Sequence, residues 1–399
     1  IGFGKQDDGR SWIGFSGGVN LIDLLPTGVS VEGLRILWNP SVDFSVDLTL
    51  QGVGIELTTP GVLHLDGGVS LMNDGDDHYF TGSATLDLSP LGINLDASIK
   101  LGHDSALDYN YVYVFLSLEL PVGIPLWATG AAIYGIAGLL GINVEPTTTN
   151  GDWYGWYAAP PEFNITDAGK WRGQLGNMAF GAGIVIGTLF DAGWTVSTKS
   201  LLALLLPGPT ILFNGKANIL QFPPGLLETS EASLNLLALF DGNAGDLLLN
   251  IDAGWELKQI IDLSASAEAY FQFARPDNWH LYLGQDQPES RRIRAYVIAL
   301  FNADAYLMID ADGIAAGFRV SYGQDWRFGP VAVALTSWIE AGAALSWQPV
   351  QLEGSLSLGG EFAVSIAGFG VGIAAEATLS GKTPKPYWVR GELALTVNL

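Results

Sequence analysis

Long stretches of the chain alternate apolar and polar residues with a period of two, which is the pattern of half-buried β-strands rather than of helices. The run GSLSLGGEFAVSI at residues 354–366 places its bulky apolar residues on one parity and serine and glutamate on the other, and a Gly-Gly pair interrupts it. Residues 85–100 and 111–120 repeat the pattern. We expect residues 354–366 to form a pair of strands and most of the chain to be sheet.

Other strands are expected to be apolar on both sides, with one bulky side and one thin side. In the run FGVGIAAEATL at residues 369–379, one parity begins with Phe369, Val371 and Ile373, and the other begins with two glycines. A thin side lets another backbone or sheet approach closely. Because no matching amphipathic helices accompany these apolar sides, we predict an all-β fold of long antiparallel strands that forms an extended or curled sheet or a sandwich.

Turn signals separate the apolar runs. The segments Asn-Asp-Gly-Asp-Asp at 73–77, Asp-Gly-Asn at 241–243, Asp-Ala-Asp-Gly at 310–313 and Gly-Gln-Asp at 323–325 are each flanked by apolar residues, as hairpin turns are. The sequence therefore predicts turns at these four positions. It also places the negative charge of the chain largely in turns.

Residues 121–144 contain no charged residue and break the alternating pattern. Their length suits a transmembrane helix, but Pro125, five glycines and the lack of flanking Lys or Arg weigh against one. Gly135, Gly138 and Gly141 recur at every third position, a thin stripe on which a helix can lie against a sheet. We therefore expect an apolar, glycine-rich helix or hairpin here rather than a membrane span.

Three regions follow from these patterns. Residues 1–120 are a β-sheet region, residues 121–180 combine the apolar helical segment with an aromatic loop insertion, and residues 181–399 are a β-sheet region of repeated hairpin units. A degenerate motif marks the repeats: after a proline come apolar residues, a polar residue and a glycine, as in VQLEGSL from Val350 and WVRGEL from Trp388. The glycine is expected where a strand bends or bulges.

The composition narrows the functional classes. The 399 residues include 18 basic and 41 acidic side chains, for a net charge of −23, whereas nucleic-acid binding relies on clustered Lys and Arg. We therefore expect no nucleic-acid partner. The chain has no cysteine, which rules out thiol catalysis, and its four histidines show no zinc-binding spacing. Because no set of residues converges on a catalytic site, we expect the protein not to be an enzyme.

Acidic turns are the candidate metal sites, because carboxylate and carbonyl oxygens of flexible loops bind Ca²⁺. The candidate ligands are Asp74, Asp76 and Asp77 in one turn and Asp310 and Asp312 in another. Neither turn completes a twelve-residue loop with a terminal Glu. Asp is also a common hairpin residue, so a calcium site and an ordinary turn are the two alternatives, and no other cofactor is expected.

An aromatic cluster marks the irregular region at residues 145–176. Aromatic side chains stack on sugar rings or anchor a partner, and they equally plug the end of a sheet. We favour the plug, since exposed aromatic patches are uncommon in monomers. The candidate ligand-binding residues are Trp153, Tyr154, Trp156, Tyr157 and Trp171.

The glycine-marked units, together with IPL at residues 124–126 continuing to YGIAGL at 134–139, resemble large bacterial all-β proteins of uncharacterised function. The chain looks like a portion of such a secreted or surface protein, which implies an extracellular or cell-surface location. The same units are more weakly similar to repeating β-groove proteins, which carry lipid along an apolar channel. That resemblance implies a sheet with a lined groove.

The expected function is a non-catalytic structural or assembly module of a larger extracellular bacterial protein. Its expected partners are copies of itself or neighbouring units, because uncharged strands such as residues 393–397 can pair with further strands. One alternative is a hydrophobic-ligand carrier in which a bulky apolar side lines a groove for lipid. Another is a carbohydrate-binding or sugar-active β protein that uses the aromatic loop to bind glycan.

Overall fold

The structure of the protein is a computed structural model, which describes residues 2–5, 11–20, 27–39, 43–49, 52–59, 63–74, 77–88, 93–148, 153, 165–220, 233–257, 260–297, 301–366, 369–384 and 386–398. Strands make up nearly all of the described chain, together with the short 3₁₀ helices η1 (Ala168–Lys170) and η2 (Glu289–Arg291). The predicted all-β fold of long antiparallel strands is confirmed. In the part of the chain that the structure describes, no helix has the length and hydropathy to cross a bilayer.

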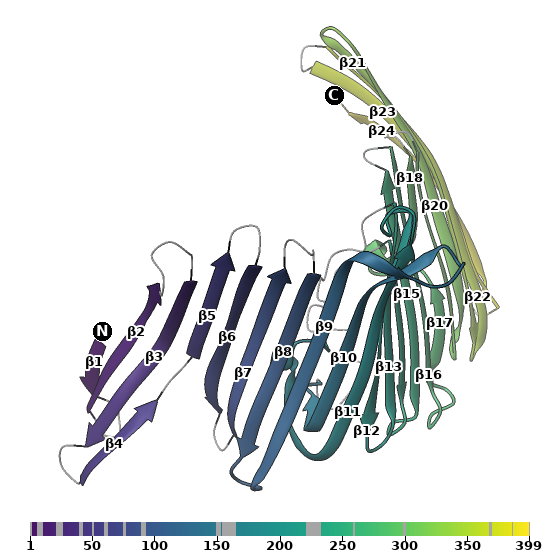
Figure 1. Cartoon of the computed structure of the whole chain (residues 1–399). Coiled ribbons are helices and arrows are strands. Elements are labelled where there is room, and N and C mark those ends of the chain that lie inside the picture. The colour runs from purple at the N-terminus through teal and green to yellow at the C-terminus, as the bar shows by residue number, and fades with distance from the viewer. Residues whose placement is uncertain are drawn as a thin grey trace. The chain divides into compact units, whose positions relative to one another are not determined.

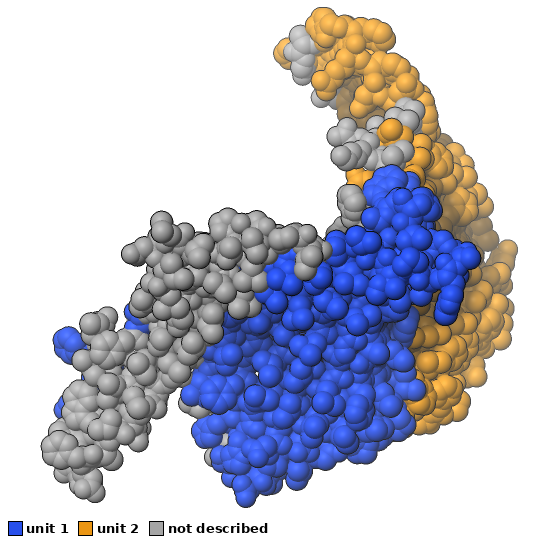
Figure 2. Space-filling view, in the orientation of Figure 1, with its two compact units in different colours: residues 1–231 blue, residues 232–399 orange. Residues whose placement is uncertain are grey.

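The chain divides into two compact units, residues 1–231 and residues 232–399 (Figure 2). Unit 1 contains strands β1 to β13, and unit 2 contains strands β14 to β24. The strands on either side of the aromatic region, and those of residues 121–144, all belong to the sheet of unit 1.

Unit 1 is an antiparallel meander in which each strand from β5 to β13 pairs with the next along the chain (Figure 1). Before it, β1 pairs with β2 and β2 with β3, and the length of β3 is shared by β4 and β5. The strands are β1 (Gly2–Lys5), β2 (Ser11–Asn20), β3 (Thr27–Asn39), β4 (Asp43–Thr49), β5 (Gly52–Thr59), β6 (Leu63–Asp74), β7 (Asp77–Leu88), β8 (Ile93–Asp104), β9 (Tyr109–Pro125), β10 (Ala131–Pro146), β11 (Trp171–Thr188), β12 (Val196–Leu206) and β13 (Thr210–Ile219).

Unit 2 is a second antiparallel meander, in which β17 and β18 share the space between β16 and β19. From β19 to β24 each strand pairs with the next. The strands are β14 (Leu234–Asp241), β15 (Asp246–Leu257), β16 (Ile261–Gln272), β17 (Trp279–Leu283), β18 (Ile293–Val297), β19 (Phe301–Asp310), β20 (Gly313–Phe328), β21 (Val331–Trp347), β22 (Val350–Ile366), β23 (Phe369–Thr383) and β24 (Trp388–Asn398).

Residues 121–144 lie in two strands and not in a helix. β9 extends through Pro125, and β10 is hydrogen-bonded to β9 on one side and to β11 on the other. The hairpin alternative is confirmed, and the predicted helical segment within residues 121–180 is wrong. The glycines permit close packing within the sheet, since a Cβ on Gly141 would collide with the Val144 side chain. Their spacing therefore marks thin strand positions rather than a helix stripe.

Three of the four predicted turns connect strands. Residues 73–77 lie between the paired ends of β6 and β7, although residues 75 and 76 are outside the described residues; residues 241–243 begin at the last residue of β14, and residues 310–313 join β19 to β20. Each turn reverses the chain between antiparallel neighbours in the way that Asp and Gly favour. These predictions are confirmed.

Two other local predictions are wrong because strands run through them. Residues 323–325 lie inside β20 and pair with β21. Residues 354–366 belong to the single strand β22, and the Gly-Gly pair does not divide it. The Trp338 ring of β21 occupies the place where a Cβ on Gly359 would lie. The glycine therefore makes room for an aromatic side chain of the neighbouring strand.

The core of unit 1 lies on one side of its sheet. Tyr113, Phe115 and Trp171 are at most 1% exposed. The Trp171 ring packs on the Tyr113 ring, with 4.7 Å between their centroids. The carbonyl of Ile165 accepts hydrogen bonds from the Tyr113 hydroxyl (2.7 Å) and the Trp171 indole (2.9 Å), so the segment before β11 covers this side. We call it the covered face of unit 1.

Candidate functional site

In the strands of unit 2 that the structure describes, one side of the sheet carries no charged side chain. The register sets Leu335 opposite Phe362, and Ile339 opposite Leu358, so these residues share a side. The register of the neighbouring strands extends this side across the whole sheet of unit 2. The side contains the even-numbered residues of β14, β20 and β22 and the odd-numbered residues of the other strands. Among these described positions there is no Asp, Glu, Lys, Arg or His. We call this side the uncharged face of unit 2.

The uncharged face is open to solvent. Leu358 in β22 is 52% exposed and Leu395 in β24 is 71% exposed. Other large apolar side chains on the same face are also exposed, among them Leu249, Leu263, Phe318, Ile339, Leu356, Phe362, Val371, Ile373 and Val397. Contiguous exposed apolar surface of this kind marks a site of interaction.

The opposite side, the charged face of unit 2, carries the ionic groups of the strands. Lys382 lies 3.1 Å from Glu353, and Arg319 lies 3.8 Å from Glu340, each pair joining neighbouring strands. Much of the charge therefore lies within strands, and the prediction that it lies largely in turns is wrong. Alternation explains the result, because the second parity of a half-buried strand is free to be acidic.

A hydrogen-bonded cluster on the charged face joins β16, β17 and β19. His280 Nε2 lies 2.7 Å from a buried Glu268 carboxylate oxygen, and the His280 ring stacks on Tyr282 at 4.3 Å between centroids. The Tyr282 hydroxyl donates to Asp310 Oδ2 at 3.2 Å. Burial first, and then the charge of Asp310 and this hydrogen bond, raise the pKa of Tyr282 to about 12. The cluster holds the three strands together through paired polar groups.

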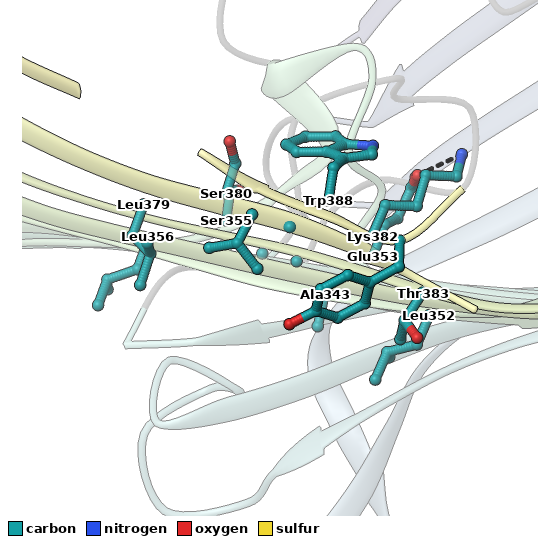
Figure 3. A pocket seen from close by; sticks show the side chains of 15 residues that line it. Ala343, Leu352, Glu353, Ser355, Leu356, Leu379, Ser380, Lys382, Thr383 and Trp388 are labelled. Atoms are coloured by element: carbon teal, nitrogen blue, oxygen red, sulfur yellow. Dashed lines mark ion pairs between the residues drawn. The ribbon is translucent and has the colours of Figure 1, made fainter. Parts of the chain in front are cut away.

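A hollow of about 430 Å³ lies where β21 to β24 carry several glycines (Figure 3). Figure 3 shows Leu352, Leu356 and Leu379 on one side of the ribbon, with Trp388 and the Lys382–Glu353 ion pair on the other. The leucines belong to the uncharged face. The hollow is of the size of a small-ligand site and is lined largely by apolar groups.

Unit 1 presents a similar apolar surface on the side opposite its covered face. The register places Leu116 opposite Gly138, and Leu140 opposite Phe180, on neighbouring strands. On this side Phe180 is 39% exposed and Ile136 is 51% exposed. Each unit therefore exposes large apolar side chains on one side of its sheet.

Comparison with known families finds no matching family model, and comparison with curated proteins finds no matching relative. The site is therefore interpreted from its own geometry.

The aromatic candidates do not gather into one surface. Trp171 is completely buried, so its ring cannot stack on a ligand, and burial with the nearby Asp167 raises the pKa of its neighbour Tyr113. This burial matches the plug rather than the sugar site for Trp171. Trp153 is half-buried. The remaining candidates, Tyr154, Trp156 and Tyr157, lie outside the described residues.

The acidic turns show ordinary turn chemistry where their side chains are described. Asp310 Oδ1 accepts hydrogen bonds from the backbone N–H groups of Asp312 (2.9 Å) and Gly313 (3.0 Å). Among the described residues, no group of three or more His, Asp or Glu side chains is placed to hold a metal ion. Asp76 lies outside the described residues, and Asp74 and Asp77 are described as backbone partners.

Sequence reasoning found the apolar sides of single strands but missed that all of them align on one face. The signal was present in the turn lengths. Two residues separate β19 from β20, β20 from β21 and β21 from β22. Such tight turns set the last residue of one strand opposite the first residue of the next, which fixes how the parities match.

Proposed function

We propose that the chain is a non-catalytic β-sheet module that holds the hydrocarbon chains of a lipid-like ligand on the uncharged face of unit 2. Charge segregation carries the proposal: the ionic groups of the strands lie on one face, and exposed apolar side chains fill the other. Covering apolar surface gains about 25 cal/mol per Å². An apolar ligand on this face is therefore favoured over water.

The scarcity of hydrogen-bonding side chains on β21 and β22 favours hydrocarbon over a protein surface. Protein interfaces form about one hydrogen bond per 100–200 Å². On the uncharged face, β22 presents no polar side chain, and β21 presents the Ser337 hydroxyl and the Trp347 indole, which donates to the Asp310 carbonyl. Hydrocarbon chains need no such partners.

The dimensions also suit an extended chain. β22 contains 17 residues, which corresponds to about 56 Å of strand at 3.3 Å per residue. An acyl chain lying along the strands contacts alternate side chains such as Leu356, Leu358 and Phe362.

The test compares the full-length wild-type chain with two variants, one with a new charge on the uncharged face and one with a new charge on the charged face. We expect lipid to co-purify, as seen by native mass spectrometry, and a fluorescent fatty acid to bind. Leu358→Asp should weaken fatty-acid binding by about tenfold or more, because a carboxylate is costly to bury against hydrocarbon. The matched control is Ser355→Asp, three residues away on the charged face, which should bind like the wild type. No lipid and no fatty-acid binding, or equal losses in both variants, would refute the proposal.

Self-assembly is a second candidate, favoured by β24. This strand is bonded along one side to β23, all of its residues are exposed, and no pairing along its other side is present among the described residues. An exposed strand edge is a template for strand addition by another chain. Arg390→Pro should lower the mass of any oligomer measured by light scattering, and an unchanged mass would exclude pairing through this edge.

A further inference from the structure

The uncharged segment at residues 121–144 ends in a hairpin tip that the proposed ligand site does not use. Residues 126–130 join β9 to β10, and residues 189–195 join β11 to β12 at the same end of the sheet. The Leu189 N–H donates to the Gly130 carbonyl at 2.8 Å, so the two tips are joined. We call them together the joined tips of unit 1.

The joined tips present large apolar side chains almost fully to solvent. Trp127 is 91% exposed and Phe190 is 78% exposed. Trp127 also has a φ of 50°, in the left-handed region that bulky residues rarely adopt. The turn holds it there, because the Leu126 N–H donates to the Ala131 carbonyl at 2.9 Å. A backbone conformation that is unfavourable for a bulky residue costs free energy, and such conformations are concentrated at functional positions.

The tips carry almost no charge. Within residues 120–135 and 183–198, Asp191 is the single charged residue. Its carboxylate accepts hydrogen bonds from the Thr188 hydroxyl and the Thr195 N–H, so it is used within its own loop. A protein interface would be expected to have a polar rim, often with Arg, around such aromatic residues. An anionic membrane would call for clustered Lys or Arg, which the tips lack.

The other end of the same strands is acidic. Asp104 and Asp108 flank the β8–β9 turn, and the Asp108 side chain is 95% exposed. β9 spans 17 residues, which places the two ends about 56 Å apart. Tryptophan and phenylalanine favour the boundary between lipid headgroups and acyl chains, whereas carboxylates stay in water.

We propose that the joined tips of unit 1 dock the protein on a zwitterionic lipid bilayer by inserting Trp127 and Phe190 into its surface. The aromatic tips are apolar and uncharged, which matches a surface without net charge, and the acidic turns stay away from it. This docking does not depend on a ligand on unit 2, so it stands or falls separately from the proposed function.

The test is flotation with phosphatidylcholine vesicles. The wild-type chain should float with the vesicles, and the double variant Trp127→Ser with Phe190→Ser should partition at least about tenfold less, since binding scales with buried apolar area. The control is Leu107→Ser, which removes a side chain of 65% exposure from the acidic end and should float like the wild type. Circular dichroism should show the same fold in all three proteins, because each altered side chain is exposed.

A second measurement does not rely on the double variant. The chain has no cysteine, so Ala128→Cys and Leu107→Cys each accept one environment-sensitive fluorophore. Phosphatidylcholine vesicles should shift the emission to the blue at residue 128 and leave it unchanged at residue 107. The proposal is overturned by a lack of flotation, by equal flotation of the double variant, or by binding that requires anionic lipid. If neither the wild type nor the double variant binds vesicles, and light scattering gives a lower mass for the double variant, the tips bind a second copy of the chain instead.

Discussion

The covered face of unit 1 and the uncharged face of unit 2 are both built from alternate residues of long antiparallel strands, yet the first is buried and the second is open to solvent. The covered face buries polar atoms: Lys100 is almost fully buried, and its ammonium donates to the Trp171 carbonyl at 2.6 Å and lies 3.9 Å from the centroid of the Tyr79 ring. The uncharged face exposes aliphatic side chains such as Leu358. An antiparallel sheet with one open side normally turns its polar side chains to water, so the uncharged face departs from the usual arrangement.

The difference teaches that alternation creates a face but does not decide what covers it. In unit 1 the segment before β11 supplies the cover, because Ala168 donates its N–H to Ser98 Oγ at 3.0 Å and Ile165 accepts from two aromatic side chains. In unit 2 the chain joins the strands from β19 to β23 by tight turns, which have no residues to spare for a cover. Any cover of the uncharged face therefore comes from outside these strands.

The largest expected loss of stability comes from a substitution in the core of the covered face. Trp171→Ala should destabilise the protein by about 3–5 kcal/mol, because it opens a cavity and removes the indole hydrogen bond to Ile165. Urea unfolding measures the loss. The control is Trp347→Ala on the exposed uncharged face, which should cost about 1 kcal/mol. Equal losses in the two variants would mean that the two faces are equally covered in solution.

The comparison also shows which features the sequence could predict. Period-two alternation predicted the strands, and the thin side of residues 369–379 is confirmed, since Gly370 and Gly372 both lie on the charged face, opposite Ser365 and Ala363. The glycines at every third position of residues 135–141 suggested a helix, because their spacing does not show which side chains pack against them. In the sheet, Gly141 is needed because Val144 packs where its Cβ would lie.

The candidate site was harder to predict than the fold. Trp171 is as aromatic as a sugar-binding residue, and its burial depends on Tyr113, which lies 58 positions earlier in the chain. The residue type can therefore suggest a binding role, but packing against residues distant in the sequence determines whether the side chain is exposed enough to bind. The uncharged face has the opposite difficulty, because no single residue in it is unusual and the signal is the shared side of many strands.

An intermediate effect concerns pH on the charged face. The pKa of Tyr282 is raised to about 12 from an ordinary value of 10.0 by burial and by Asp310. The folded state therefore keeps the proton longer than the unfolded state, so this contribution to stability is complete below about pH 10 and is lost as the pH rises towards 12. Two pKa units correspond to at most about 2.7 kcal/mol, which partial exposure reduces to roughly 1–2 kcal/mol.

Melting temperatures between about pH 8 and pH 12 test this expectation. Tyr282→Phe should be less stable than the wild type at neutral pH and should lose less stability on the alkaline side. Tyr387→Phe, which alters an exposed tyrosine of the same unit, should follow the wild-type curve. If the Tyr282 and wild-type curves stay parallel up to about pH 12, the hydroxyl does not titrate with folding.

The smallest expected loss of stability comes from a leucine on the uncharged face, and it compares the two faces most directly. Leu212 is fully buried on the covered side of unit 1, and Leu212→Ala should cost about 2–5 kcal/mol. Leu358→Ala on the uncharged face should cost less than about 1 kcal/mol in lipid-free protein, because half of that side chain is already in water. Urea unfolding of both variants gives the ratio. A cost for Leu358 as large as for Leu212 would mean that the face is covered in solution. Repeating the measurement at tenfold dilution then identifies the cover, since a second copy would dissociate and the cost would fall, whereas a cover from within the chain would leave it unchanged.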